Sequence, residues 1–194
     1  MEKIKKGAIE VICGNMYSEK SSTLIRKLKR LQYSKKTIEV FKPKMDNRYS
    51  EDKITTHEGI EFAAKSVENS KDIKNFLLAK MEKYPDVVAI DEIQFFDEGI
   101  IQVVEDLADM GIYVIVAGLD QDFRGEPFRI VADLLARAEY ITKLSSVCVV
   151  CGESASKSQR LVDGKPASLS DPTILVGGVE SYEPRCRKHF ENKE

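Results

Sequence analysis

The 194-residue sequence lacks the features of several protein classes. No apolar run approaches the roughly 18 residues of a membrane-spanning helix, and the opening residues MEKIKKGAIE contain no apolar stretch typical of a secretory signal. Thirty Lys and Arg nearly balance 32 Asp and Glu, so the net charge of -2 provides no field to hold a nucleic-acid backbone or an anionic membrane. We therefore expect a cytoplasmic protein that binds neither nucleic acid nor membrane.

Cysteine is also scarce. The four cysteines could form disulfides, but such bonds are rare in the reducing compartment that we expect. Cys13 ends an apolar stretch and is expected to be a buried small hydrophobic residue. The other three lie late in the chain, where metal binding is the better interpretation.

Short apolar runs alternate with amphipathic segments over most of the chain. Runs rich in β-branched residues predict strands at 8–13, 37–41, 86–90 and 112–119, and 140–144 can be a last strand. Apolar residues at helical spacing predict helices at 20–34, 72–81, 99–110 and 127–137. Because apolar strands that alternate with helices form parallel sheets covered on both faces, we expect an α/β fold. The stretch 44–65 is a polar connection with at most a short hairpin.

Beyond residue 144 the pattern changes. The segments are short and polar, with Gly and Pro between them, and no run is long enough to build a core. A tail of this size is too small to fold by apolar burial alone. We therefore divide the chain into a main domain at 1–144 and a small appendage at 145–194 that requires an additional stabilising element.

The first motif with chemical meaning follows the first predicted strand. The sequence GNMYSEKS at 14–21 lies between a buried strand and a helix, the context that makes a GxxxxGK[ST] phosphate-binding loop credible. In such a loop, main-chain N–H groups and the helix N-terminus surround the phosphates, while Lys20 neutralises them and Ser21 binds Mg²⁺. The pattern has one defect, because Glu19 occupies the position of its second glycine.

A pair of acidic residues strengthens this interpretation. Asp91 and Glu92 come directly after the predicted strand at 86–90, at the edge of a parallel sheet where ligands bind. One carboxylate there can hold the Mg²⁺ of a triphosphate, and its neighbour can accept the proton of an attacking hydroxyl. The alternative is an exposed acidic strand end without a function.

The late cysteines form a second motif. Cys148 and Cys151 make a CxxC pair, and Cys186 with His189 makes a CxxH pair 35 residues further on. Three thiolates and one imidazole are a suitable tetrahedral set for a structural Zn²⁺, which would also stabilise the polar tail. A redox CxxC is the alternative, and the matching second pair argues against it.

Together these motifs resemble the type II, zinc-containing thymidine kinases, over nearly the whole chain from Gly7 to His189. The resemblance is carried by GNMYSEKS at 14–21, DNRYS at 46–50, AIDEIQFF at 89–96, GLDQDFRGEPF at 118–128, CVVC at 148–151 and VGGVESYEPRCRKH at 176–189. It implies a P-loop NTPase-like sheet domain with a small zinc-ribbon and lasso domain. It also implies transfer of the γ-phosphoryl group of ATP to the 5′-hydroxyl of thymidine.

The resemblance assigns roles to individual residues. Glu92 matches the catalytic base, Asp91 the acidic residue on the magnesium side, and Asp46 with Arg48 a mobile active-site segment. The ATP and phosphate contacts are Gly14, Asn15, Met16, Tyr17, Ser18, Glu19, Lys20, Ser21 and Asp91. The nucleoside contacts are Met16, Phe95, Leu119, Phe123, Phe128, Ser158, Tyr182 and the main chain of a lasso loop that includes Thr173, Ile174, Leu175, Val176 and Gly177. Alone, Phe128 is better explained as helix core.

The resemblance further implies a homotetramer and feedback inhibition by the end-product triphosphate. Glu19 is the departure from the family pattern, and it predicts weakened ATP binding because a carboxylate is repelled by phosphates and a side chain restricts the loop. Two alternatives remain: a non-catalytic nucleotide or nucleoside binder disabled at Glu19, and a different P-loop ATPase or GTPase that uses its zinc ribbon to bind another macromolecule.

Overall fold

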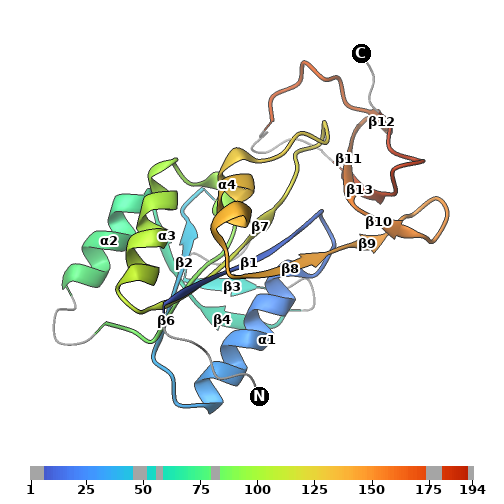
Figure 1. Cartoon of the computed structure of the whole chain (residues 1–194). Coiled ribbons are helices and arrows are strands. Elements are labelled where there is room, and N and C mark those ends of the chain that lie inside the picture. Colours follow the sequence, from blue (N-terminus) through green and yellow to red (C-terminus); the bar gives the residue numbers. More distant parts are fainter. Residues whose placement is uncertain (1–6, 46–51, 56–58, 80–83, 174–180, 192–194) are drawn as a thin grey trace.

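The computed structural model describes residues 7–45, 52–55, 59–79, 84–173 and 181–191. The main domain is a sheet of six parallel strands in the order β5-β2-β6-β7-β1-β8, with helices on both faces (Figure 1). In chain order these strands are β1 (Ala8–Gly14), β2 (Ile38–Pro43), β5 (Lys65–Val67), β6 (Val87–Ile90), β7 (Tyr113–Leu119) and β8 (Tyr140–Leu144). The predicted α/β fold is therefore confirmed.

Alternation along the strands divides the interior into two apolar layers. On β1, Ile9, Val11 and Cys13 face one layer, whereas Ala8 and Ile12 face the other. Side chains of successive strand residues point to opposite faces, so a central strand buried on both sides must be apolar throughout. Cys13 has no exposed surface, which confirms that it is a buried residue, and burial raises the pKa of its thiol.

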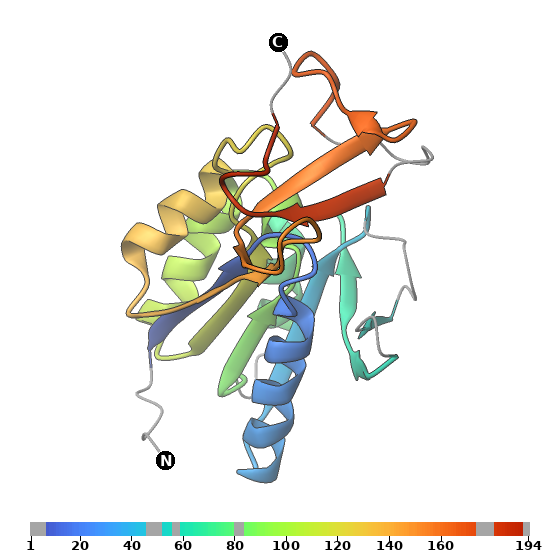
Figure 2. The ribbon, with the colours of Figure 1, turned by 90° about the vertical axis from the view of Figure 1, so that its right-hand side faces the viewer.

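The helices cover the two faces unequally. Helices α2 (Ser70–Ala79), α3 (Gly99–Asp109) and α4 (Arg129–Arg137) pack on the Cys13 face, and α1 (Lys20–Tyr33) packs on the Ile12 face (Figure 2). Each helix buries an apolar stripe; in α1 the stripe includes Leu24, Ile25, Leu28 and Leu31. All four predicted helices are present, with ends that match the expected ones or differ by at most two residues.

The polar connection agrees with the sequence-based expectation, whereas two strands of the main sheet, β5 and β2, differ from it. The hairpin of β3 (Lys53–Thr55) and β4 (Glu61–Ala63) confirms the short hairpin in the polar connection. The edge strand β5, however, was not predicted, because three residues are too few to establish a period. In addition, β2 reaches Pro43 instead of ending before it, since a proline at the last position removes only one ladder hydrogen bond.

The tail contains short strands that the sequence did not predict. These are β9 (Ser146–Val147), β10 (Ser154–Ala155), β11 (Lys157–Val162), β12 (Lys165–Pro166) and β13 (Ser181–Arg185). The pairs β9–β10, β11–β12 and β11–β13 are antiparallel. Figure 1 shows this small unit beside the carboxyl end of the main sheet. Among the described residues, none of the helices is long and apolar enough to cross a membrane.

Candidate active site

The loop between β1 and α1 has the form of a phosphate-binding loop. Gly14 begins it, and a Cβ at this position would lie 2.6 Å from the carbonyl oxygen of Leu144 and 2.7 Å from Oγ of Ser18. Only glycine therefore allows β8 to approach the loop so closely. The ammonium group of Lys20 donates a hydrogen bond to the carbonyl oxygen of Asn15 at 2.6 Å, which keeps this cation at the mouth of the loop.

Glu19 precedes α1 in a left-handed conformation. Its φ and ψ are 62° and 33°, its side chain makes no capping hydrogen bond, and it is exposed to solvent. This conformation favours glycine, and it costs a residue with a Cβ about 1–2 kcal/mol. The backbone therefore takes the shape of the phosphate-loop pattern even though the sequence does not supply the glycine.

Ser21 and the acidic pair meet across the sheet edge. Oγ of Ser21, in the first turn of α1, donates a hydrogen bond to Oδ2 of Asp91 at 3.1 Å. Asp91 is 5% exposed. Burial, reinforced by the negative charge of Glu92, raises the pKa of Asp91 from 3.8 to about 7. A buried carboxyl group beside a second carboxylate is an arrangement that a cation would stabilise.

Glu92 is held by a residue that the sequence analysis did not identify. Gln94 donates from Nε2 to Oε2 of Glu92 at 2.5 Å and accepts at Oε1 a hydrogen bond from the main-chain N–H of Leu119 at 3.0 Å. Glu92 itself has a φ of 50°. The amide of Gln94 thus links the acidic pair to the end of β7. In the sequence, the only indication of this role was a Gln two residues after the acidic pair.

The tail contacts the phosphate loop directly. The side-chain amide of Asn15, which is 2% exposed, donates to Oγ of Ser146 at 2.6 Å and to the carbonyl oxygen of Lys157 at 3.1 Å. Oγ of Ser158 accepts a hydrogen bond from the main-chain N–H of Met16 at 2.9 Å. Two strands of the tail, β9 and β11, therefore fix the loop from the side opposite to α1.

The residues expected around the nucleoside lie in several places. Phe123 is buried to 4% exposure, and Phe128 is partly buried against the core beside α4, as its alternative interpretation expected. Phe95 and Leu119 are partly buried at the edge that carries Glu92. Tyr182 lies on β13, and Thr173 is exposed. The other expected contacts, Asp46, Arg48, Ile174, Leu175, Val176 and Gly177, lie outside the described residues.

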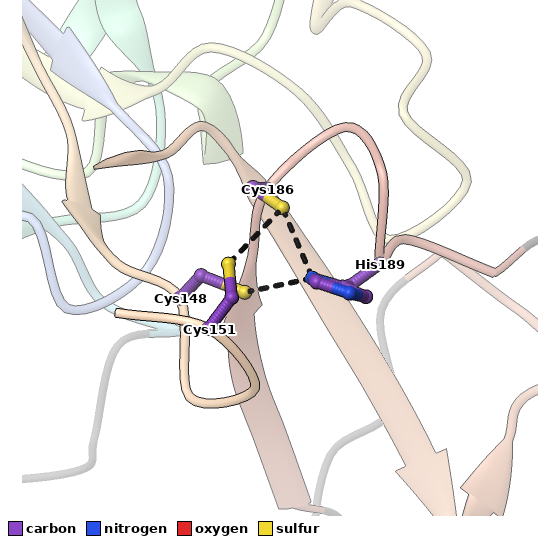
Figure 3. A group of neighbouring side chains, drawn as sticks. All are labelled: Cys148, Cys151, Cys186 and His189. Carbon is purple, nitrogen blue, oxygen red and sulfur yellow. Dashed lines mark hydrogen bonds between the residues drawn. The ribbon is translucent and has the colours of Figure 1, made fainter. Parts of the chain in front are cut away.

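The three late cysteines and the histidine converge on one point (Figure 3). Sγ of Cys151 lies 3.8 Å from Sγ of Cys186, and Nδ1 of His189 lies 3.3 Å from Sγ of Cys186 and 3.8 Å from Sγ of Cys148. Sulfurs bound to one tetrahedral Zn²⁺ at about 2.3 Å would be about 3.8 Å apart. The donor set and its spacing therefore fit a zinc ion.

Two thiols of this cluster have pKa values that shift in opposite directions. A main-chain hydrogen bond from Glu153 lowers the pKa of Cys151, but desolvation and the neighbouring thiols of Cys148 and Cys186 outweigh it and raise that pKa. Although desolvation alone would raise the pKa of the Cys148 thiol, hydrogen bonds from the main chain of Cys186, Val150 and Cys151 lower it to about 5. A thiol that ionises readily is a good metal ligand.

Comparison with known proteins agrees with this geometry. The family model described as thymidine kinase matches residues 7–190, nearly the whole chain. The chain belongs to the thymidine kinase family. Within the thymidine kinases, its Cys₃His cluster fits the zinc-containing type II class. The chain is also similar to a crystal structure of the flagellar accessory protein FlaH from Methanocaldococcus jannaschii, with 13% identity and a TM-score of 0.47 over 78% of this chain and 76% of that one.

Proposed function

We propose that the protein is a thymidine kinase that transfers the γ-phosphoryl group of ATP to the 5′-hydroxyl of thymidine. One observation carries the proposal: Ser21 of the phosphate loop is hydrogen-bonded to Asp91, directly beside Glu92, in a chain of the thymidine kinase family. Phosphoryl transfer needs phosphate binding, a metal ligand and a group that orients the nucleophile. These requirements correspond to Lys20, to Ser21 with Asp91, and to Glu92.

The metal proposal rests on the donor set. The hydroxyl of Ser21 and the buried carboxyl group of Asp91 are oxygen ligands of the kind that Mg²⁺ prefers, and burial beside the Glu92 carboxylate, which raises the pKa of Asp91, is an environment that a cation would stabilise. When bound there, Mg²⁺ would neutralise negative charge on the phosphates. Lys20 and the main-chain N–H groups at the start of α1 would bind the phosphates themselves.

Glu92 is proposed as the catalytic base. Its carboxylate would accept the proton of the 5′-hydroxyl as that oxygen attacks phosphorus. Oε2 of Glu92 accepts the hydrogen bond from Gln94, which holds the carboxylate in one orientation. A base fixed in this way needs little reorganisation during the reaction.

For the nucleoside we propose a pocket between the main domain and the tail. The expected contacts from Met16, Phe95, Leu119, Phe123, Phe128, Ser158 and Tyr182, together with the main chain at 173–177, stay predictions. Support comes from the hydrogen bond of Ser158 to Met16, which joins one expected contact of the tail to one of the phosphate loop. The proposed zinc ribbon at 145–194 would stabilise the tail side of this pocket.

Glu19 supports a second candidate, a variant that binds nucleotides but transfers phosphate slowly or not at all. The left-handed conformation at Glu19 is strained for a residue with a side chain, and its carboxylate adds negative charge where phosphates would bind. We therefore propose an active enzyme with weakened ATP binding and keep the non-catalytic binder as an outcome of the test.

Three further expectations belong to the same proposal, the first from the sequence composition and the other two from the resemblance. The enzyme would be a cytoplasmic homotetramer, and its end-product triphosphate would inhibit it. Analytical ultracentrifugation would test the tetramer, and initial rates with added thymidine triphosphate would test the inhibition. Neither result affects the assignment of the residues at the phosphate loop.

A coupled assay of ADP release, with and without thymidine, tests the function. Release that depends on thymidine, with thymidine monophosphate as product, is the expected result. Release without thymidine would indicate a different P-loop ATPase, in which the zinc ribbon binds another macromolecule. No release, combined with measurable binding of thymidine in calorimetry, would identify the non-catalytic binder.

A further inference from the structure

In the loop that follows β7, two guanidinium groups lie over one aromatic ring. Phe123 is 4% exposed, and Cζ of Arg124 and Cζ of Arg160 lie over its ring, at 4.6 Å and 5.0 Å from the centroid. Arg160 has no exposed surface. Arginine is almost never fully buried without partners, so the Arg160 cation must be held by specific contacts, whereas Arg124 is partly exposed.

The contacts of Arg124 lead to one short segment of the tail, Leu169–Thr173. Nε of Arg124 donates to the carbonyl oxygen of Leu169 at 2.8 Å, Nη2 to that of Asp171 at 2.5 Å, and Nη1 to Oγ1 of Thr173 at 2.7 Å. Nη1 also donates to Oδ2 of Asp122 at 2.8 Å, which fixes the orientation of the guanidinium plane. The planar guanidinium group of Arg124 thus donates hydrogen bonds to three residues of the segment.

Arg160 reaches the same segment from β11. Its Nη1 donates to the carbonyl oxygen of Pro172 at 2.8 Å. The two arginines together therefore bind the main chain or side chain of four of the five residues from Leu169 to Thr173.

Among the described residues, few other contacts hold this segment in place. Ser170, Pro172 and Thr173 are exposed, and none of the five residues belongs to the buried apolar core. Its internal hydrogen bonds, such as that of the Asp171 N–H to the carbonyl oxygen of Ser168 at 3.0 Å, shape a turn but do not attach it to the main domain. Apolar burial cannot fix a segment of this kind, so polar contacts such as those of the two arginines must hold it.

The attachment is close to the proposed reaction site. The N–H of Leu119, five residues before Arg124, is bonded to Gln94, which holds Glu92. In the same loop, Oε1 of Gln121 accepts a hydrogen bond from Lys157 at 2.6 Å, next to Ser158. The loop after β7 is therefore tied both to the acidic pair and to β11.

We propose that Arg124, together with Arg160, is a positioning residue that fixes Leu169–Thr173 against the loop after β7 and thereby sets the affinity for the nucleoside. Neither guanidinium group need contact the nucleoside. This inference rests on the proposed function, because it takes thymidine as the ligand. It adds a role for two residues that the family resemblance does not assign.

The test compares Arg124→Met with Arg137→Met in the zinc-loaded full chain. Arg137, the last residue of α4, makes a surface ion pair with Glu105 of α3, so its replacement is the same chemical change away from the segment. For Arg124→Met we expect the KM for thymidine to rise about tenfold or more, with kcat and the KM for ATP within about twofold. Backbone amides at 169–173 should exchange hydrogen for deuterium faster, and Arg137→Met should match the unmodified protein.

Two further variants separate charge from geometry. Arg124→Lys keeps the charge but cannot bridge three positions, so we expect nearly the effect of Arg124→Met. Thr173→Val removes one hydrogen bond at an exposed position and should raise the KM for thymidine about two- to fivefold. It also provides the test if Arg124→Met fails to fold.

The outcomes are distinct. Faster exchange at 169–173 with an unchanged KM for thymidine would overturn the positioning role, and unchanged exchange would overturn the attachment itself. A rise in the KM for ATP equal to that for thymidine would indicate general disruption and would also contradict the inference. Failure of the proposed function would instead appear in the unmodified protein, as absence of thymidine-dependent turnover.

Discussion

In the main domain, the side chains without exposed surface are almost all apolar, as Ile12, Leu24 and Val114 illustrate. In the described part of the tail, the apolar residues that are buried are only Cys148, Ala155 and Ala167. The other buried residues there are polar: Ser158, Gln159 and Arg160. The main domain is therefore stabilised by two apolar layers, whereas the tail relies on hydrogen bonds and on the proposed zinc site.

Gln159 illustrates the second kind of contact. Its side-chain amide donates from Nε2 to the carbonyl oxygen of Glu191 at 3.0 Å and accepts from the N–H of the same residue at 2.8 Å. Such hydrogen bonds contribute about 0.5–1.5 kcal/mol each, but leaving a buried partner unpaired costs more. The tail is consequently well defined only while its polar contacts and metal ligands are all satisfied.

Our proposal follows this difference: the main domain carries the chemistry, and the affinity for the nucleoside depends on the tail as well as on the main domain. The largest test is Glu92→Gln, which we expect to lower kcat by about 10²- to 10⁴-fold because an amide cannot accept the proton. Affinity for thymidine, measured by calorimetry, should stay within about twofold. Turnover and binding assays on the same preparation check both values.

Glu98→Gln is the matched control for this test. Glu98 is an exposed carboxylate just before α3, and its ion pair with Arg129 lies at the surface. Its replacement should leave kcat unchanged, since exposed ion pairs contribute little. Equal losses in both variants would refute the role of Glu92.

Removal of zinc tests the proposed contribution of the tail to nucleoside affinity. We expect Cys186→Ala, or a chelator, to weaken thymidine binding about tenfold or more, because the tail would lose the zinc ion that we propose orders it. The far-ultraviolet helix signal should persist, since α1 to α4 all lie in the main domain. Titrating chelator while recording both signals checks this order of loss.

Cys13→Ala is the control for the metal site. Cys13 is buried in the main domain and takes no part in the cluster, so zinc content and thymidine affinity should be unchanged apart from a small loss of stability. If helix signal and thymidine affinity disappear together on chelation, the proposed boundary near residue 145 does not separate two units.

The same contrast explains how much the sequence could predict. Apolar periodicity identified four helices and five of the six strands of the main sheet, because burial on one or both faces imposes a period on those residues. Strand β11 could not be found in this way, since Ser158, Gln159 and Arg160 are buried but polar. Their positions are decided by partners far away in the chain, such as Pro172 and Glu191.

Likewise, the sequence predicted some contacts of the candidate site and could not predict others. The convergence of Lys20, Ser21 and Asp91 follows from the rule that loops at the carboxyl edge of a parallel sheet meet. The cysteine and histidine spacing likewise predicted the cluster around Cys186. No local pattern could show that Arg124 binds the segment 169–173, because that contact joins two loops whose approach depends on the whole tail.

A smaller effect is expected at the junction between the two regions, in the phosphate loop. Glu19→Gly should remove a negative charge and relieve part of the left-handed strain, together on the order of 1 kcal/mol, so we expect about five- to tenfold tighter ATP binding and a higher rate at low ATP. Glu19→Gln removes the charge but keeps the Cβ, and should give part of the gain. Initial rates at varied ATP measure both, and an unchanged or worse enzyme would show that Glu19 does not weaken ATP binding.

The smallest expected effect concerns the amino edge of the main sheet, far from the tail. Asp86 accepts hydrogen bonds from the Thr37 N–H at 3.0 Å, from Oγ1 of Thr37 at 2.9 Å and from Nζ of Lys36 at 3.0 Å. These hydrogen bonds, of which the one from the main chain has the largest effect, lower the pKa of Asp86 from 3.8 to about 2. The three hydrogen bonds join the starts of β2 and β6. Because this position is open to solvent, we expect Asp86→Asn to lower the free energy of unfolding by only about 1 kcal/mol at pH 7.

The sign of the pH dependence follows from the lowered pKa of Asp86. Because its folded-state pKa lies below the unfolded value, the contribution is complete above about pH 5 and is lost as pH falls through 3.8 toward about 2. Urea unfolding of the two proteins between pH 7 and 2.5 should therefore give curves that converge at the acidic end. Thr37→Val, which removes one of the three donors, should show a smaller difference with the same convergence. A gap between the unmodified protein and Asp86→Asn that stays constant to pH 2.5 would mean that the ionised carboxylate is not what joins the two strands.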